Sequence, residues 1–453
     1  MKPGLNRRDF MKAAGAGAAA IAFTGCGSPD LLKTFLPDNG RRGKIITGRK
    51  LNIASVGCGG KGYSDTKGLA HENIVALCDV DASRAAKTFG EFPKAKKYKD
   101  YRVMLDEMDD QIDAVSISTP DHMHFPIALE AIKRGKHVLV QKPLAHTVEE
   151  ARILTLAARR HQVVSQMGNQ GHAGEGNRLI QEWIAADVLG EVREVHAWSN
   201  RPIWPQGMAE QLPAEAVPSS LDWDLWLGVA QTRPYNKGYA PFKWRGWWDF
   251  GCGALGDMGC HTLDAPYMAL GLGYPDSVSA ESEGATAEAG PKQSKVVYEF
   301  PARGKMPPVT ITWYDGGLKP ERPKDLEEGR KLADNGVLIV GSKATLMDTT
   351  SYARSPRLIP ESKMREFSKN RPPKTIPRVP EGDHYKEWTQ ACKGAGPLPG
   401  SNFDFSGPFS EMVLMGNLAV RMSGKTIEWD GENMVCTNEA EANNLVRKTY
   451  REF

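Results

Sequence analysis

Short apolar runs alternate with longer amphipathic stretches along residues 50–171, and together they predict strands and helices in regular succession. Apolar runs bounded by turn residues predict buried strands, and apolar positions that recur every three or four residues predict helices. The predicted strands cover 51–56, 74–78, 112–118, 137–140 and 163–166. One predicted helix follows the first strand and its glycine-rich loop and ends near residue 71, and the others cover 81–89, 125–134 and 147–161. Alternation of this kind predicts an α/β fold with a parallel, doubly wound sheet.

The pattern changes after about residue 171. A helix is predicted over 175–186 and a half-exposed strand over 192–200. Further strands are predicted at 277–282, 295–300, 309–313, 337–340 and 345–348, a long surface loop at 350–382, and a helix at 409–421. Consecutive strands with few helices predict a second α/β domain over 172–453 with an open, mainly antiparallel sheet. We expect the segment after the last helix to pack back on the first domain.

The first 26 residues differ from both domains. Arg7 and Arg8, followed by Phe10 and Lys12, precede a short stretch rich in Ala and Gly. That stretch is shorter than the roughly 20 apolar residues that a membrane-spanning helix needs. The pattern resembles a twin-arginine signal, which exports folded proteins.

Residues 23–26 resemble a lipoprotein cleavage box. Cleavage before Cys26 would leave a lipid on its sulfur and anchor the protein to the membrane on the periplasmic side. The alternative is ordinary cleavage nearby and a periplasmic protein without an anchor. The stretch 27–49, rich in Gly, Pro, Lys and Arg, is expected to be a linker.

Composition narrows the class of protein. Hydrophobic residues make up 40% of the chain, which is enough to form the cores of globular domains. Removal of the signal would leave roughly 427 residues, a length that fits two domains. The 58 basic and 55 acidic residues give a net charge of +3 and are scattered, so no nucleic-acid partner is expected. Seven cysteines without CxxC spacing predict no disulfide framework.

A glycine loop follows the first predicted strand. Gly57, Gly59, Gly60 and Gly62 form a Gly-x-Gly-x-x-Gly pattern, and Asp79 ends the second strand 22 residues after the first glycine. Such glycines let a pyrophosphate approach a helix N-terminus closely. A carboxylate at the second strand accepts hydrogen bonds from ribose hydroxyls and repels a 2′-phosphate. The sequence therefore predicts a Rossmann domain over 50–171 that binds NAD rather than NADP.

Three further segments carry a family resemblance: 119–124 (TPDHMH), 140–144 (VQKPL) and 256–261 (GDMGCH). With the glycine loop, they make the chain resemble the Gfo/Idh/MocA family of glucose–fructose oxidoreductase and inositol dehydrogenase. The resemblance implies an N-terminal Rossmann domain and a C-terminal α/β domain whose open sheet forms oligomer contacts. It also implies oxidation or reduction of a sugar or cyclitol with NAD(P), and a homo-oligomer, either dimer or tetramer.

The resemblance also implies roles for single residues. Lys142 matches the family's Glu-Lys-Pro lysine, although Gln141 stands where Glu is usual, and Asp257 and His261 match the second-domain motif. His261 is expected to act as a base with a pKa near neutral, and Lys142 to donate to the alkoxide. Asp257 lies four residues before His261 and is expected to bind a sugar hydroxyl. The expected cofactor contacts are completed by Thr119, Pro120, His124, Gln141 and Lys142.

Eight of the eleven tryptophans fall between residues 183 and 248. Most are expected to pack in the core. Trp244, Arg245 and Trp247 lead toward the second-domain motif and are candidates for substrate contact, as is His172 after the last Rossmann strand. The His122-x-His124 pair beside Asp121 lacks a second ligand pair, so no metal site is expected.

Three functions remain open. The first is an exported NAD-dependent oxidoreductase acting on a sugar, glycoside or cyclitol hydroxyl. The second is a redox-neutral glycoside hydrolase that holds NAD tightly and oxidises, eliminates, adds water and reduces. The third is a cofactor-binding sensor without turnover. Twin-arginine export favours a tightly held cofactor, because no NAD pool outside the cytoplasm regenerates it.

Overall fold

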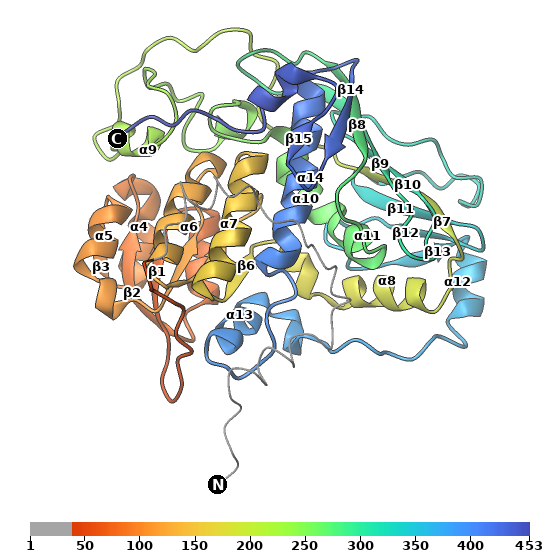
Figure 1. Cartoon of the computed structure of the whole chain (residues 1–453), viewed down its shortest axis with the longest axis horizontal. Helices are drawn as coiled ribbons and strands as arrows, with labels where there is room; N and C mark the ends of the chain where they lie inside the picture. The colour runs from red at the N-terminus through yellow and green to blue at the C-terminus, as the bar shows by residue number, and fades with distance from the viewer. Residues whose placement is uncertain (1–38) are drawn as a thin grey trace.

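A computed structural model describes residues 39–453, so the signal segment and Cys26 lie outside the described residues (Figure 1). The N-terminal sheet has six parallel strands in the order β3-β2-β1-β4-β5-β6. Its strands are β1 Asn52–Val56, β2 Asn73–Cys78, β3 Lys96–Tyr98, β4 Ala114–Ile117, β5 His137–Val140 and β6 Ser165–Met167. Its helices are α3 Lys61–Gly68, α4 Ala82–Glu91, α5 Tyr101–Glu107, α6 His124–Lys133 and α7 Val148–His161. The predicted parallel doubly wound sheet is confirmed.

Local signals place the ends of these helices. The Asp81 carboxylate caps α4 by accepting from Ser83 N at 3.0 Å, and Thr147 forms a capping box with Glu150 at the start of α7. The sequence-based prediction did not include β3 or α5. The strand β3 consists of only three residues, Lys-Lys-Tyr, and has no apolar run that would predict it.

The C-terminal sheet has nine strands in the order β13-β12-β11-β7-β10-β9-β8-β14-β15. Within this sheet β7 and β10 form the one parallel pair among the described strands and the other neighbours are antiparallel, so the mainly antiparallel prediction is confirmed. The strands are β7 Val192–Trp198, β8 Ser277–Glu283, β9 Gln293–Phe300, β10 Val309–Tyr314, β11 Gly336–Gly341, β12 Thr345–Asp348, β13 Arg357–Ile359, β14 Thr426–Asp430 and β15 Val435–Cys436. The longer helices are α8 Glu175–Ala185, α9 Trp223–Leu227, α10 Gly253–Thr262, α11 Asp264–Ala269, α12 Glu361–Phe367, α13 His384–Cys392 and α14 Phe403–Arg421.

Two local predictions were wrong. The stretch 350–382 is not one loop, because β13 adds an edge strand and α12 buries Met364 against the core. Helix α14 begins at Phe403 rather than near 409, and it contains Pro408. Burial along nearly its whole length outweighs the low helix propensity of its Ser-Gly-Pro sequence.

Helices α7 and α14 lie side by side between the two sheets (Figure 1). Arg152 on α7 donates from Nε and Nη2 to the buried carboxylate of Glu411 on α14, at 2.8 and 2.7 Å. One cluster of buried apolar residues is continuous across this boundary. The two sheets are therefore held in a fixed relation, and the space between their loops is preorganised.

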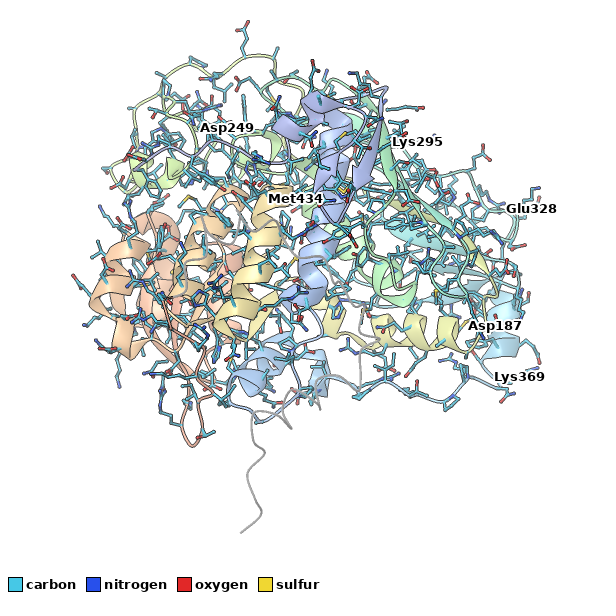
Figure 2. The ribbon with its side chains drawn as sticks, in the orientation of Figure 1. Asp187, Asp249, Lys295, Glu328, Lys369 and Met434 are labelled. Atoms are coloured by element: carbon cyan, nitrogen blue, oxygen red, sulfur yellow. The ribbon has the colours of Figure 1, made fainter. Side chains whose placement is uncertain are left out.

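Both end segments of the described chain pack against the N-terminal α/β domain. The ring of Tyr450 stacks on Phe125 and its hydroxyl donates to Glu150 at 2.8 Å. Residues 39–49 form no helix or strand. They are nevertheless hydrogen-bonded to the N-terminal domain, since Gly43 N donates to His161 O at 2.8 Å. The exposed charged side chains of Asp187, just after α8, and Lys369, just after α12, lie on the side of the molecule away from the N-terminal sheet (Figure 2).

Candidate active site

A cavity of about 490 Å³ opens at the carboxyl ends of the parallel strands, where ligands bind in doubly wound sheets. The N-terminal sheet contributes the loops that follow β1, β2, β4, β5 and β6. The other half contributes α10, the segment after β7 and the single turn η4 Lys243–Gly246. The lining residues that carry the argument are Gly57, Gly59, Gly60, Asp79, Thr119, Pro120, Asp121, Gln141, Lys142, Arg201, Trp244, Arg245, Asp257, His261 and Tyr352.

The glycine loop is shaped for close approach of a ligand. Gly57 and Gly60 have φ of 78° and 57°, which only glycine adopts readily, and a Cβ at Gly57 would lie 2.7 Å from the Ser118 backbone. A Cβ at Gly62 would overlap the carbonyl oxygen of Gly57, so this glycine lets α3 pack against the loop rather than lining the cavity. Helix α3 has no side-chain cap. Within its first turn the Gly62 amide donates to Gly59 O at 3.0 Å, and the other amides at its start remain for a pyrophosphate.

Asp79 lines the cavity and holds the glycine loop. Its Oδ2 accepts from Cys58 N at 2.7 Å and Gly59 N at 3.2 Å, and its Oδ1 accepts from Asp81 N at 2.9 Å. Burial raises the pKa of this carboxyl, while the backbone donors oppose the rise. The residues present therefore fit a dinucleotide.

Asp65 explains why Gln141 replaces the usual Glu. Its carboxylate is fully buried; Oδ2 accepts from Gln141 Nε2 at 3.0 Å and Ser118 Oγ at 2.7 Å, and Oδ1 accepts from Tyr385 Oη at 2.6 Å. A Glu at 141 would bring a second carboxylate to a site that needs a donor. Asp65 could not be singled out from the sequence, because its spacing from Lys61 is that of a surface ion pair on a helix.

Replacing Gln141 with Glu is expected to destabilise the fold by about 2–4 kcal/mol, because two buried carboxylates then face each other. Adding Asp65→Asn should restore most of this loss by returning one amide donor and one carboxylate. Urea unfolding of both variants measures the difference. A single variant as stable as the natural protein, or a double variant no better than the single one, would contradict this pairing.

Lys142, Asp257 and His261 meet inside the cavity. Lys142 Nζ donates to Asp257 Oδ1 at 2.7 Å and to its backbone oxygen at 2.9 Å. Burial opposes the charged form of Asp257, but Lys142 and then Arg245 outweigh it and hold the pKa of this carboxyl well below its usual range. The α10 helix presents Asp257 and His261 one turn apart.

His261 departs from the near-neutral pKa predicted for it. It is 6% exposed, and burial, followed by the charge of Lys142, lowers its pKa to about 3. Its Nδ1 is buried without a hydrogen-bond partner among the described residues, and its ring meets Tyr352 edge-on at 4.7 Å. The imidazole is therefore neutral at pH 7 and a weaker base than an ordinary histidine.

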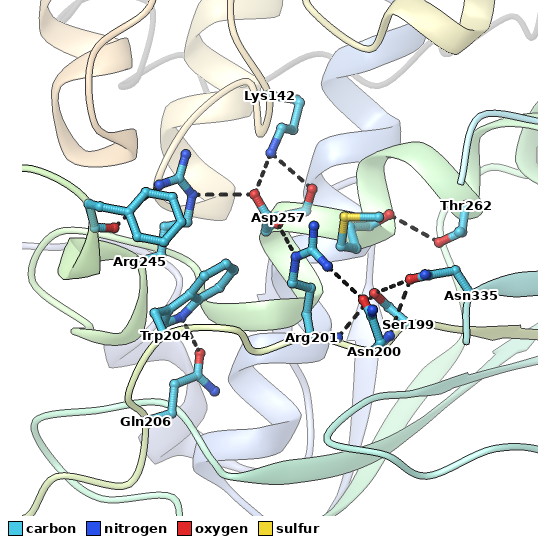
Figure 3. Close-up of polar contacts among 12 residues, drawn as sticks. Lys142, Ser199, Asn200, Arg201, Trp204, Gln206, Arg245, Asp257, Thr262 and Asn335 are labelled. Atoms are coloured by element: carbon cyan, nitrogen blue, oxygen red, sulfur yellow. Dashed lines mark hydrogen bonds and ion pairs between the residues drawn. The ribbon is translucent and has the colours of Figure 1, made fainter. Parts of the chain in front are cut away.

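Two arginines join this group (Figure 3). Arg245 was a candidate from the sequence; its Nε lies 3.3 Å from Asp257 Oδ1. Arg201 was missed, and its Nε lies 3.5 Å from Asp257 Oδ2. Its position just after β7 is the only sequence signal that could have pointed to it.

Besides Gly62, three candidates lie outside the cavity lining. His172 is buried and its Nδ1 lies 2.8 Å from Asp264 Oδ1, so it ties a turn to α11. Trp247 is 1% exposed and packs edge-on against Tyr239. His124 bonds the carbonyls of Pro143 and Thr119 at 2.8 and 2.9 Å. It is a positioning residue that joins two cavity loops, and the sequence could not show that its ring is enclosed.

Within residues 39–453, no group of three or more His, Cys, Asp or Glu side chains could hold a metal ion, and no helix has the length and apolarity to cross a bilayer. The six cysteines in this part of the chain are free and buried. His122, beside Asp121, bonds the carbonyls of Phe250 and Trp226 and is part of the packing.

Family models match more than half of the chain. One, described as oxidoreductase family, NAD-binding Rossmann fold, matches residues 51–169, and its C-terminal alpha/beta domain counterpart matches 177–304. A twin-arginine translocation signal matches 4–24, which confirms that prediction.

Curated relatives include a glycosyl hydrolase family 109 protein from Shewanella baltica (strain OS185), 28% identical over 206 residues. One from Shewanella putrefaciens (strain CN-32) is 29% identical over 205 residues. Each alignment spans 42% of this chain and 44% of the relative.

Solved structures share the fold across most of the chain. The WlbA dehydrogenase from Bordetella pertussis, in complex with NADH and UDP-GlcNAcA, has a TM-score of 0.59 at 18% identity, covering 84% of this chain and 99% of that one. The aldose-aldose oxidoreductase from Caulobacter crescentus has a TM-score of 0.56 at 16% identity, covering 84% and 100%. An inositol dehydrogenase homolog from Azotobacter vinelandii has a TM-score of 0.54 at 16% identity, covering 86% and 100%. At these identities the likeness concerns the fold alone.

Proposed function

Because the chain belongs to the Gfo/Idh/MocA oxidoreductase family, we propose that it is an exported NAD-dependent oxidoreductase acting on a hydroxyl of a sugar, glycoside or cyclitol. One observation carries the proposal: the glycine loop and the group of Lys142, Asp257 and His261 line the same cavity. A cofactor on the loop and a hydroxyl at that group would then share one enclosed space.

The cofactor would lie along the ends of the parallel strands. The amides at the start of α3 would hold the pyrophosphate, and Asp79 would accept from the ribose hydroxyls and disfavour a 2′-phosphate, so NAD is preferred. When bound, the nicotinamide supplies the hydride acceptor. Thr119, Pro120 and Gln141 line the same cavity and would complete the contacts with the cofactor.

The chain's own residues manage the proton and the developing charge. As the carbinol C–H bond breaks, neutral His261 accepts the hydroxyl proton, and Lys142 donates a hydrogen bond to the oxygen as it becomes a carbonyl. Asp257 fixes the ammonium of Lys142 at 2.7 Å and so sets the position of this donor. In the reverse reaction the same proton returns from His261 to the alkoxide.

The pH profile of kcat/KM should reflect the low pKa of His261. A base must be deprotonated to act, and a pKa of about 3 keeps it so down to about pH 4, so the acid limb should fall below pH 5. Asp121 also lines the cavity, and burial raises its pKa to about 6. Asp121→Asn is therefore the control. A limb near pH 6.5 that persists in this variant would contradict the assignment.

The proposed activity is tested on protein purified after export. Denaturation followed by mass spectrometry should release about one NAD per chain, and adding the substrate sugar to the native protein should raise the absorbance at 340 nm. A second carbonyl compound should reverse the rise. Protein free of NAD that also binds none when it is supplied would refute the proposal.

A second candidate is redox-neutral glycoside cleavage with NAD retained through the cycle. The family 109 glycosyl hydrolase relatives and the twin-arginine match favour it. Transient oxidation of a ring hydroxyl would acidify the neighbouring C–H, and elimination, water addition and reduction would follow. This chemistry releases an aglycone without a net change in absorbance at 340 nm, and in deuterated water it brings deuterium to the carbon beside the oxidised one. Net oxidation of a free sugar releases no aglycone and incorporates no solvent deuterium.

The twin-arginine match also supports a periplasmic location. We propose lipidation at Cys26 as the form of anchoring, and a homo-oligomer formed through the open sheet. Globomycin, which blocks lipoprotein cleavage, should make the precursor accumulate if Cys26 is lipidated and leave processing unchanged if it is not.

A further inference from the structure

Three cationic side chains from three separate segments surround one carboxylate in the cavity (Figure 3). Lys142 Nζ lies 2.7 Å and Arg245 Nε 3.3 Å from Asp257 Oδ1, while Arg201 Nε lies 3.5 Å from Oδ2. All four residues line the cavity. One carboxylate cannot neutralise three cations, so this part of the cavity carries an excess of positive charge.

The neighbouring ionisable groups do not remove that excess. Asp121 is a second carboxylate, and its Oδ2 accepts from Cys252 N at 3.0 Å. His261 is neutral at pH 7 because burial lowers its pKa. Lys61 pairs with the buried Asp65, so that pair adds no net charge. Even with Asp121 fully ionised, three cations face two carboxylates.

Both guanidinium groups keep an unused donor. Arg201 Nη1 donates to Asn200 Oδ1 at 2.6 Å, and Arg245 Nη1 to Phe242 O at 3.4 Å. The Nη2 atom of each has no hydrogen-bond partner within the described part of the chain. The Arg245 guanidinium lies 4.2 Å from the Trp244 ring centroid, which holds it in place.

The two arginines are also partly shielded from water. Their side chains are 25% and 23% exposed. Partly buried cations without full neutralisation are unfavourable unless a ligand supplies the missing charge. Guanidinium groups bind carboxylate, phosphate and sulfate oxygens through paired donors.

We propose that the substrate carries an anionic group that Arg201 and Arg245 bind, while Lys142 and His261 face the hydroxyl that is oxidised. The inference rests on the proposed function and narrows its substrate to acidic sugars: uronic or aldonic acids, or sugar phosphates or sulfates. A neutral sugar would leave both Nη2 atoms unpaired and the excess charge in place.

The test is isothermal titration calorimetry of the NAD-loaded protein with matched hexoses, hexuronates and hexose 6-phosphates of gluco, galacto and manno configuration. For at least one configuration, the acidic member should bind about 10- to 100-fold more tightly than the neutral one, and added salt should reduce the difference. The uronate and phosphate arms show which anionic group is preferred.

Variants assign the preference to the two arginines. Arg201→Gln and Arg245→Gln should each reduce the acidic preference by about 10-fold. Arg193→Gln removes the same charge from β7, where the side chain is 62% exposed and pairs with Glu191, and should keep the full preference.

A neutral sugar that binds as tightly as its acidic partner, or no binding of any acidic sugar, would overturn the inference. The absorbance at 340 nm separates this outcome from failure of the proposed function. Neutral sugars that reduce the bound NAD without acidic preference leave the oxidoreductase standing and remove the anion subsite. Acidic sugars that bind through Arg201 and Arg245 without any absorbance change do the reverse.

Discussion

Replacing Lys142 with methionine is expected to lower kcat/KM about 1000-fold, the largest effect of any single change in the cavity. The ammonium donates to the oxygen as charge develops on it, and losing one such donor typically costs a factor of 10²–10³ in rate. Asp257 keeps Arg245 and Arg201 as partners, so the fold should remain intact. Initial rates at 340 nm with the substrate sugar measure the loss.

Lys133→Met is the matched control, because Lys133 on α6 does not line the cavity. It should retain full activity. NAD content, measured after denaturation, should stay at about one per chain in both variants, which separates lost chemistry from lost cofactor. A Lys142→Met protein with more than about a tenth of the natural activity would contradict the proposed role.

Replacing Gly62 with alanine is expected to abolish co-purification of NAD and to destabilise the fold by about 3 kcal/mol or more. The new Cβ would overlap the carbonyl oxygen of Gly57, which forces the glycine loop and α3 apart. Urea unfolding and NAD content after denaturation measure the two effects.

Gly90→Ala is the matched control within the same sheet's helices. A Cβ at Gly90, on α4, meets no heavy atom within 4 Å, so alanine should stabilise this helix by about 0.5–1 kcal/mol and leave NAD content unchanged. Equal behaviour of the two variants would show that the close approach at Gly62 is not required.

The sequence was enough to predict the parts of the fold that depend on local patterns. The strand at 137–140 was predicted to the residue, because four buried apolar or His positions lie between Gly135 and Lys142. The glycine loop and the lysine were found because their chemistry depends on spacing along the chain. The three-residue strand β3 and the edge strand β13 were missed, since their pairing depends on neighbours distant in sequence.

The remaining features of the site depend on burial and on contacts between distant segments. The pKa of His261 is set by enclosure between α10 and Tyr352, which no single segment encodes. Gln141 could not be understood without Asp65, 76 residues earlier. His172 resembled a substrate contact from its place after a strand, but Asp264 on another helix turns it into a structural pair.

The central claim is that a carbinol carbon in this cavity passes its hydride to a nicotinamide held by the glycine loop. Its most direct test is a single turnover with substrate sugar deuterated at every ring carbon, followed by mass spectrometry of the released cofactor. For the natural protein we predict reduced cofactor that is one mass unit heavier than unlabelled NADH. For Lys142→Met we predict that the cofactor is recovered as unlabelled NAD. Unlabelled cofactor from the natural protein, under conditions in which the sugar is consumed, would contradict the claim.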